Sequence, residues 1–341
     1  MASTALALDP EQELLQRLQR IRRGEDPRPL ELDLRGARLI DADLRGLDLS
    51  GWDLRGADLS RARLEGCRFV KARLVDASLF EARCEGAEFL GADLTGATLS
   101  SASCERAGFG HAVLVRAQAV DAVFDGATFT EADLGDADLR ASSFVGARFV
   151  EAGLVGTSFE AACLSEADLE GARLRRTCFR RADLRRATLR AVDDYRHADW
   201  IYADVRDVDW NGAWLVRRHV LDENFLHEFR HASPAHARLY TVWKATSDCG
   251  RSLTRWGAWT AGIAVVFALI YTQVGVDFGD SPTWLSPLYF SVVTLTTLGY
   301  GDALPTSVSG QVAVMVQVLL GYGMLGGLLS IFSTKMGRRA D

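Results

Sequence analysis

Charged residues are missing from two long stretches near the C-terminal end of the sequence. No Asp, Glu, Lys or Arg occurs from Trp256 to Val276, and none occurs between Asp302 and Lys335. A helix of about 20 apolar residues crosses the roughly 30 Å hydrocarbon layer of a bilayer. Two buried helices of a soluble protein would be the alternative, but both uncharged runs are long enough to span. We therefore predict two membrane-spanning helices.

Other absences narrow the class of protein. The six cysteines show no CxxC spacing, so we expect free thiols and neither a metal site nor a disulfide framework. No phosphate-binding loop, nucleotide motif or calcium loop is present. The apolar run from Ala5 to Leu8 is too short for a signal peptide, and acidic residues follow it at once. A net charge of −6 argues against a role in binding nucleic acid.

A period of five residues dominates the first half of the chain. Of the 32 positions 32, 37, 42 and onward to 187, 25 are Ala, and two residues after each of these positions 29 of 32 are Leu or Phe. Neither the 3.6-residue period of a helix nor the two-residue period of a strand explains this pattern. Each repeat of five contains one small and one large apolar residue. This suits a solenoid in which every repeat forms one short face and points these two side chains into the core.

These repeats, such as Ala57-Asp58-Leu59-Ser60-Arg61, resemble the pentapeptide-repeat family over residues 32–191. The resemblance implies an all-β, right-handed, quadrilateral β-helix with four pentapeptides per coil. Cys84 and Cys104 are 20 residues apart and should stack, buried and inert. Asp193-Asp194 breaks the register by one residue, and larger side chains follow to residue 215, which predicts a ninth coil that closes the core. We therefore expect a rod over residues 32–215, about nine coils long.

The N-terminal segment, residues 1–31, is predicted to hold a helix. Asp9 is a suitable N-cap, Pro10 suits the first helical position, and Gly24 should end the helix. Leu14, Leu18 and neighbouring apolar residues form one face. We expect this helix to cap the open end of the rod, with partner binding as the alternative.

Basic residues gather in the last part of the repeats. A voltage sensor would need them at every third position of an apolar helix, whereas here they recur every five. Consecutive repeats occupy different faces, so they should form a ring around one coil. This ring is a solvated collar that balances nearby acids, or it contacts anionic lipid or a neighbouring rod. The ring consists of Arg175, Arg180, Arg185 and Arg190.

Residues 216–252 form a connector that contains an HExxH pattern, His227 to His231. This pattern occurs in zinc proteases, but a protease also needs a third ligand and a cleft, which a short connector does not offer. An amphipathic helix interrupted near Pro234 explains the residues better. A regulatory metal or proton site made by His227, His231 and His236 stays as the alternative.

The membrane part is predicted to run from residue 253 to 334, with spans at about 254–275 and 307–334. Between them, Ser286-Pro287 starts a helix at about 287–296 that is too short to cross. Basic residues flank the pair of spans, which places both termini, the rod and the tail at 335–341 in the cytoplasm. These flanking residues are Arg251, Arg255, Lys335, Arg338 and Arg339.

The segment Thr297-Leu298-Gly299-Tyr300-Gly301-Asp302 follows the short helix. It resembles the selectivity filter of two-helix potassium channels, with Leu298 where Val or Ile is usual. The resemblance implies an all-α pore domain of four subunits, whose backbone carbonyls at residues 297–301 and the Thr297 hydroxyl hold dehydrated K⁺. It also implies that Asp302 lies at the outer mouth and that Gly321 is a gating hinge. Gly323, Gly326 and Gly327 are rival hinges, or they let helices pack closely.

We therefore expect a homotetrameric, potassium-selective channel of the inner (plasma) membrane, without a voltage sensor, enzymatic activity or cofactor. Its rod would serve regulation, assembly or docking to an unknown cytoplasmic protein or ligand. The alternatives are a non-selective cation channel and a membrane-tethered scaffold whose rod binds a protein partner. Ion flux across liposomes separates the channel from the scaffold.

Overall fold

The structure is a computed structural model that describes residues 10–23, 25 and 33–336. The chain divides into two units, Met1–His227 and Glu228–Asp341. We call the first the rod unit and the second the helical unit. The predicted N-cap Asp9, the predicted stop at Gly24 and residues 337–341 of the predicted tail lie outside the described residues.

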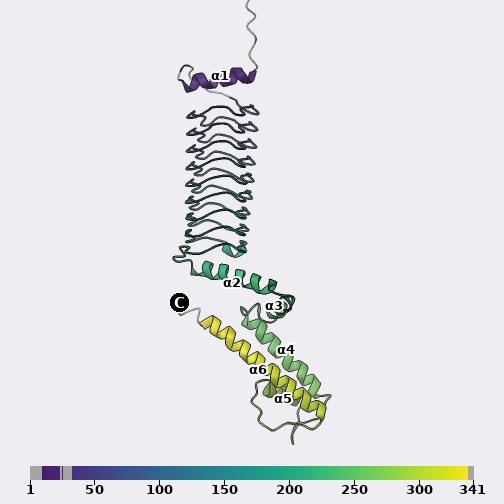
Figure 1. Cartoon of the computed structure of the whole chain (residues 1–341). Helices are drawn as coiled ribbons and strands as arrows, with labels where there is room; N and C mark the ends of the chain where they lie inside the picture. The colour runs from purple at the N-terminus through teal and green to yellow at the C-terminus, as the bar shows by residue number, and fades with distance from the viewer. Residues whose placement is uncertain (1–9, 24, 26–32, 337–341) are drawn as a thin grey trace, which may run out of the picture. The chain divides into compact units, whose positions relative to one another are not determined.

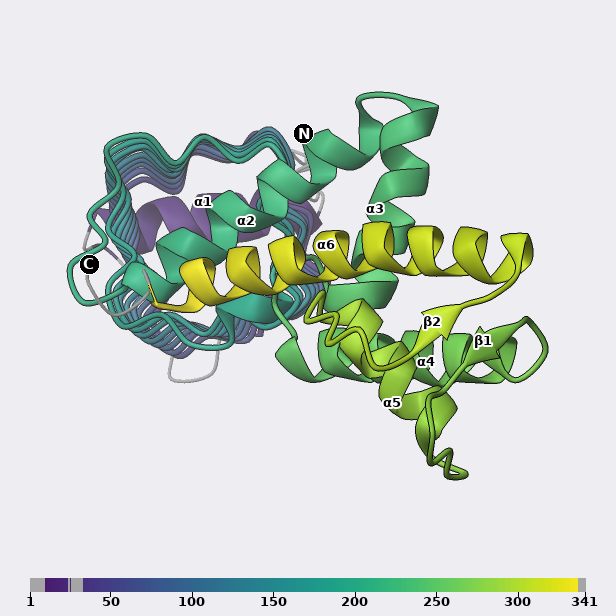
Figure 2. The ribbon, with the colours of Figure 1, turned by 90° about the horizontal axis from the view of Figure 1, so that it is seen from below.

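The rod unit is a stack of short coils (Figure 1). Parallel bridges join residues 20 apart in the sequence, beginning with Asp33 and Asp53, so four pentapeptides make each coil. Seen along the stack, successive coils overlie one another (Figure 2). Backbone hydrogen bonds between coils hold the stack, as between the Leu34 N–H and the Asp53 carbonyl at 3.0 Å. The predicted β-helix of about nine coils is confirmed.

The repeated apolar pair fills the core of the rod. The Ala positions and the Leu or Phe positions are almost completely buried throughout the stack. Phe89 and Phe109 stack with ring centroids 4.8 Å apart, and Phe109 and Phe129 follow at 4.9 Å. Cys84 and Cys104 are buried at neighbouring levels, as predicted. A side chain of one coil therefore packs on its equivalent in the next.

The corners of the coils require left-handed backbone, which the sequence pattern did not reveal. Every fifth residue has a positive φ, for example Gly36 at 63°, Asp41 at 56° and Arg61 at 56°. For residues other than Gly this conformation costs about 1–2 kcal/mol. The corner N–H groups donate to the next coil, as from Arg61 to the Phe80 carbonyl at 2.8 Å. Stacking therefore offsets the local strain, and a corner position tolerates a charged side chain.

Helices cover both ends of the rod. Helix α1 (Pro10–Arg22) buries Leu18 in the rod core, which agrees with the predicted cap. At the other end the spacing of bridged residues rises to 21, from Cys178 to Asp199, where Asp194 is left-handed and the 3₁₀ turn η1 (Tyr195–His197) follows. The extra residue is accommodated there, as the break in register predicted.

The rod core continues beyond the predicted boundary at residue 215. Helix α2 (Trp214–His231) buries Val216 and Val220 in the same core. The Asn224 amide donates to the Trp200 carbonyl at 3.0 Å and accepts from the Tyr202 N–H at 2.7 Å. The last coil would otherwise expose apolar side chains and unpaired backbone groups, so α2 closes it. Residues 216–227 of the predicted connector thus belong to the rod unit.

The helical unit contains three helices of the predicted pore domain. Helix α4 spans Leu253–Tyr271, α5 spans Ser286–Leu295 and α6 spans Val308–Met336. Helix α3 (Pro234–Ser247) precedes them, and the Ser233 hydroxyl caps it by accepting from the His236 N–H at 3.2 Å. The predicted interruption of the connector near Pro234 is therefore present.

The first span ends earlier than predicted, at Tyr271 in place of 275. The chain then forms a small antiparallel ribbon in which β1 (Val276–Asp277) pairs with β2 (Leu304–Pro305). Strand β1 follows α4 closely in the chain, and β2 directly precedes α6. Residues 272–275 form the turn between α4 and β1. The ribbon ties together the two ends of the loop that carries α5.

Helices α4 and α6 are long and apolar enough to cross a membrane. Only 17% of the most apolar stretch of α4 and 11% of that of α6 are buried within the subunit. The central helix of a soluble protein would be mostly buried, so this low burial argues against the soluble alternative. The exposed apolar sides of both helices require lipid or other subunits.

Candidate functional site

The short helix α5 delivers a loop of unusual backbone. Ser291, Val293, Thr294 and Leu295 of α5 are buried within the helical unit. Past the end of the helix, the Leu298 N–H donates to the Val293 carbonyl at 3.0 Å, so the start of the loop is held against the last turn. The C-terminal end of a helix carries partial negative charge, here directed toward residues 296–302.

Left-handed residues alternate along this loop. The φ angle is 57° at Thr297, 52° at Gly299 and 80° at Gly301. A positive φ at every second residue turns successive carbonyls toward one side, which an ion path lined by carbonyls requires. The two glycines adopt this conformation at little steric cost. The β-branched Thr297 does not, and strained residues of this kind concentrate at functional sites.

The side chains of the loop are not part of a soluble core. Leu298 is 60% exposed and Tyr300 is 67% exposed in the single subunit. Large apolar and aromatic side chains left bare in this way mark a surface for other subunits or for lipid. A buried Tyr300 would have contradicted the filter prediction, and the structure does not show one.

One hydrogen bond and one close backbone contact hold the far end of the loop. The Tyr289 hydroxyl of α5 donates to the Asp302 carboxylate at 2.8 Å. Gly279 approaches the Asp302 backbone so closely that a Cβ there would lie 3.0 Å from its carbonyl oxygen. The residue predicted at the outer mouth is therefore held from two sides.

The glycines of α6 differ in their surroundings. A Cβ on Gly321 would overlap the Leu295 carbonyl oxygen, and one on Gly327 would overlap the Trp256 ring. A Cβ on Gly323 or Gly326 would meet nothing within 4 Å. Gly321 and Gly327 therefore allow close packing, one of the two roles considered from the sequence. Helix α6 is continuous through Gly321, so the hinge role stays a prediction.

A buried polar cluster, which the sequence analysis missed, lies behind α5. Gln317 of α6 is completely buried although its side chain is polar. Its amide is hydrogen-bonded to Tyr271 of α4 and to Ser291 of α5. The only sequence signal was a polar amide inside an uncharged run, which Gln311 of the same helix shares. The partners of Gln317 are 26 and 46 residues away.

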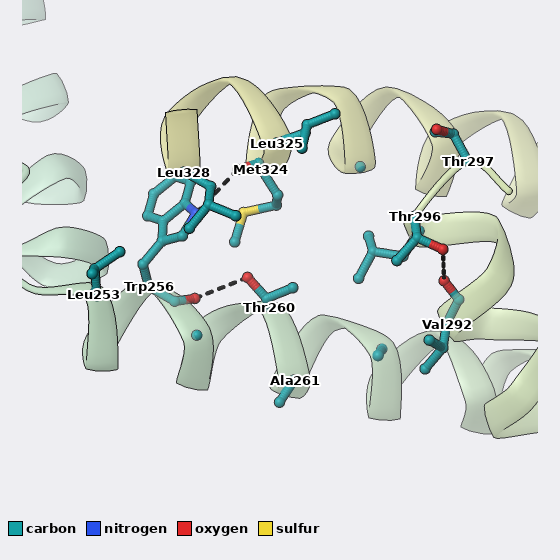
Figure 3. Close-up of a pocket in the computed structure, with 14 residues that line it drawn as sticks. Leu253, Trp256, Thr260, Ala261, Val292, Thr296, Thr297, Met324, Leu325 and Leu328 are labelled. Carbon is teal, nitrogen blue, oxygen red and sulfur yellow. Dashed lines mark hydrogen bonds between the residues drawn. The ribbon is translucent and has the colours of Figure 1, made fainter. Parts of the chain in front are cut away.

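An apolar cleft of about 450 Å³ lies beside the start of the loop (Figure 3). On one side the Trp256 indole N–H donates to the Met324 carbonyl at 3.1 Å, which joins α4 to α6. On the other side Thr296 and Thr297 line the cleft. The Thr296 hydroxyl donates to the Val292 carbonyl at 2.8 Å, so this polar group is satisfied within α5.

The described residues around the connector histidines show no group of metal ligands. No group of three or more His, Cys, Asp or Glu residues suited to a metal occurs among the residues that the structure describes. His227 contacts the edge of Tyr202, with ring centroids 5.1 Å apart. The Nδ1 atom of His236 is 2.7 Å from the Ser233 hydroxyl at the start of α3. The predicted site at His227, His231 and His236 therefore gains no support.

Acidic residues of the rod neutralise three of the four predicted ring arginines. The Arg185 guanidinium lowers the pKa of the Asp183 carboxyl below its usual value through their hydrogen bonds. These pairs favour the solvated collar over a lipid or partner contact, which stays a prediction. The pairs are Arg180 with Asp199 at 2.7 Å, Arg185 with Asp183 at 2.6 Å, and Arg190 with Asp209 at 3.4 Å.

Comparison with known proteins identifies both parts of the chain. Residues 258–338 match the family model described as "Ion channel". Eight copies of pentapeptide repeats match within residues 33–190. The chain joins pentapeptide repeats to an ion-channel domain. This ion-channel domain contains α5, the loop with alternating left-handed residues and α6.

The relatives of the ion-channel domain include potassium channels. The calcium-gated potassium channel TvoK of Thermoplasma volcanium is 36% identical over 62 residues, which are 18% of this chain and 18% of that protein. The two-pore potassium channel 4 of Arabidopsis thaliana is 29% identical over 127 residues, which are 34% of this chain and 40% of that protein. The chain thus spans less than half the length of either relative.

The rod is similar to solved pentapeptide-repeat proteins. HetL, a pentapeptide-repeat protein of the cyanobacterium Nostoc, is 25% identical with a TM-score of 0.41, over 57% of this chain and 93% of that one. The β-helix itself is established by the bridges between residues 20 apart.

Proposed function

We propose that the chain is the subunit of a potassium-selective channel in which four copies surround one ion path. Each copy contributes one loop, and its backbone carbonyls replace the water around a dehydrated K⁺ ion. Asp302 lies at the outer mouth, and the hydroxyl of Thr297 adds a ligand at the inner end. The carbonyls are those of Thr297, Leu298, Gly299, Tyr300 and Gly301.

The alternation of left-handed residues at Thr297, Gly299 and Gly301 carries this proposal. This backbone conformation is costly for Thr297. The loop comes directly after the C-terminal end of the buried helix α5, whose partial negative charge favours cations. The exposure of Leu298 and Tyr300 supports assembly, because neighbouring subunits would cover them. The similarity of the ion-channel domain to potassium channels supports the choice of ion.

Both termini and the rod face the cytoplasm in this proposal, and the channel lies in the inner (plasma) membrane. The basic residues Arg251 and Arg255 precede α4, and Lys335 ends the uncharged run of α6. Asp277 and Asp280 lie in the loop between the spans, which faces outward. Lys and Arg are enriched in the cytoplasmic segments next to membrane spans, which supports this orientation.

The rod serves assembly, regulation or docking to a cytoplasmic partner in this proposal. Its inward apolar side chains are packed in the core, and three of the four ring arginines pair with the rod's own acids. We assign the chain no catalytic step and no cofactor other than the permeant ion. Nucleic acid is not expected as a partner because the net charge is negative.

Ion flux from the reconstituted full-length protein tests the proposal. Liposomes that contain the protein should take up K⁺ or Rb⁺ and largely exclude Na⁺. Gly299→Ala should abolish this discrimination, because alanine at the φ of 52° costs about 1–2 kcal/mol in each of four subunits.

Gly262→Ala is the matched control, since a Cβ at Gly262 of α4 meets nothing within 4 Å. It should conduct as the wild type does. Equal K⁺ and Na⁺ flux would favour a non-selective cation channel. A correctly folded protein without any flux would favour the membrane-tethered scaffold.

A further inference from the structure

The buried cluster behind α5 joins three helices through one amide. The Tyr271 hydroxyl of α4 donates to Gln317 Oε1 at 2.6 Å. Gln317 Nε2 donates to the Ser291 carbonyl at 3.0 Å and to Ser291 Oγ at 2.6 Å. Ser291 Oγ in turn donates to the Ala264 carbonyl of α4 at 2.7 Å. The bonds therefore run from α4 through α6 and α5 back to α4.

The direction of every bond in this cluster is fixed. The Ser291 carbonyl only accepts, so the amide nitrogen of Gln317 must face α5 and its oxygen must face α4. Both amide hydrogens are used, and Ser291 Oγ both accepts and donates. Gln317 and Ser291 are completely buried, and in such surroundings an unpaired polar group is costly. Loss of the amide would leave the Tyr271 hydroxyl without its acceptor.

Gln317 is also one of two successive contacts between α6 and α5. Gly321 follows it by one helical turn, and Leu295 follows Ser291 by one turn. Gln317 bonds to Ser291, while Gly321 lies against the Leu295 carbonyl. A shift of α6 along α5 would break the hydrogen bonds and move the glycine away from its close contact. The two contacts together fix α5 against α6.

We propose that Gln317 is a positioning residue that sets the depth of α5 and, through it, the place of the filter carbonyls. Thr297 begins the alternating backbone two residues after Leu295, so a displaced α5 displaces the carbonyls. Gln317 itself does not contact the ion path. The proposal rests on the proposed function, because it assumes that the loop selects ions.

Gln317→Met tests this assignment in the full-length protein reconstituted in liposomes. Methionine has a similar length and removes all three hydrogen bonds of the amide. We expect the ratio of K⁺ to Na⁺ flux to fall about tenfold, equivalent to about 1.4 kcal/mol, while the oligomer stays assembled. Gln311→Met is the matched control, because Gln311 lies on the same helix with its side chain exposed. It should leave the flux ratio unchanged.

Tyr271→Phe adds a second, milder variant that removes one hydroxyl and keeps the ring packed on Phe290. If Tyr271 acts through Gln317, the flux ratio of Tyr271→Phe should fall about threefold, less than that of Gln317→Met. The double variant should then have the same flux ratio as Gln317→Met alone. If the two substitutions only created cavities, the fall in flux ratio of the double variant should instead be the combined fall of the two single variants. If Gln317→Met does not assemble, Tyr271→Phe decides the matter alone, and an unchanged ratio refutes the proposal.

The outcomes separate this inference from the proposed function. A wild-type protein without selective K⁺ flux refutes the proposed function. A selective wild type whose Gln317→Met variant keeps its flux ratio refutes only the positioning role. Loss of selectivity in Gln311→Met to the same extent would likewise contradict it, because the Gln311 side chain is exposed and is not part of the buried cluster.

Discussion

Gly321 of α6 lies directly against the backbone carbonyl of Leu295, the last residue of α5. A Cβ at Gly321 would lie 3.0 Å from the Leu295 carbonyl carbon and would overlap the oxygen. Contact of this kind needs a glycine, because any side chain would separate the helices. The junction between α5 and the proposed filter is therefore built on the absence of a side chain in α6.

Gly321→Ala should weaken the helical unit. The added methyl cannot rotate away from backbone atoms, and overpacking of this kind costs about 1–3 kcal/mol. Gly323→Ala is the control, because a Cβ there meets nothing within 4 Å. Alanine favours a helix over glycine by about 1 kcal/mol. The thermal stability of the oligomer in detergent should fall for Gly321→Ala and should not fall for Gly323→Ala.

A hinge at Gly321 predicts a different pattern for the same two variants. Alanine would then stiffen α6 and change the fraction of time that the channel is open, with little effect on the stability of the oligomer. Equal stability of both variants together with altered opening of Gly321→Ala would contradict the packing account.

Cys67 should resist alkylation while the rod is folded. Burial raises the pKa of this thiol to about 12, and its Sγ donates to the Leu44 carbonyl at 2.9 Å. Compared with an ordinary thiol of pKa about 8.5, its thiolate fraction near pH 8 falls by about three orders of magnitude. Iodoacetamide followed by mass spectrometry should modify Cys249, which is partly exposed, long before Cys67. Simultaneous modification of the two residues would show that the coil around Cys67 opens.

Asp53 should make the stability of the rod depend on pH. The Arg55 side chain donates to this carboxylate at 2.8 and 2.6 Å and lowers its pKa to about 2. An unfolded Asp has a pKa of about 3.9. The contribution of Asp53 is therefore complete above about pH 4 and disappears as the pH falls through 2.

Comparison of the wild type with Asp53→Asn isolates this contribution. Chemical unfolding of the two proteins, followed between pH 5 and 2, should show a difference in stability that shrinks as the pH falls. A difference that stays constant over this range would mean that folding does not lower the pKa of Asp53.

The sequence predicts the rod well because its signal is repeated and local. Every coil needs the same inward pair, so 25 alanines and 29 large apolar residues in 32 repeats leave little choice of fold. The break at Asp193-Asp194 was visible for the same reason. The left-handed corners were not, because Arg61 and Gly36 occupy equivalent corners and share no side-chain property.

The helical unit was predicted in outline but not in its contacts. The spans and the short helix follow from the length of uncharged runs, and the loop follows from its glycines and Tyr300. Two features depend on the pairing between Val276 and Pro305, namely the ribbon of β1 and β2 and the early end of α4. No local sequence pattern predicts this pairing. The bonds of Gln317 likewise join residues that are distant in the sequence. Such long-range contacts set how the loop is held.

The central claim is that backbone carbonyl oxygens of four loops coordinate a dehydrated cation. A structure of the assembled protein determined in the presence of Tl⁺ tests it most directly. Tl⁺ substitutes for K⁺ and is located by its anomalous scattering. The account predicts a four-fold assembly with a column of Tl⁺ on the axis, between the carbonyls of residues 297 to 301. A three-fold or five-fold assembly, or thallium density away from these carbonyls, would contradict it.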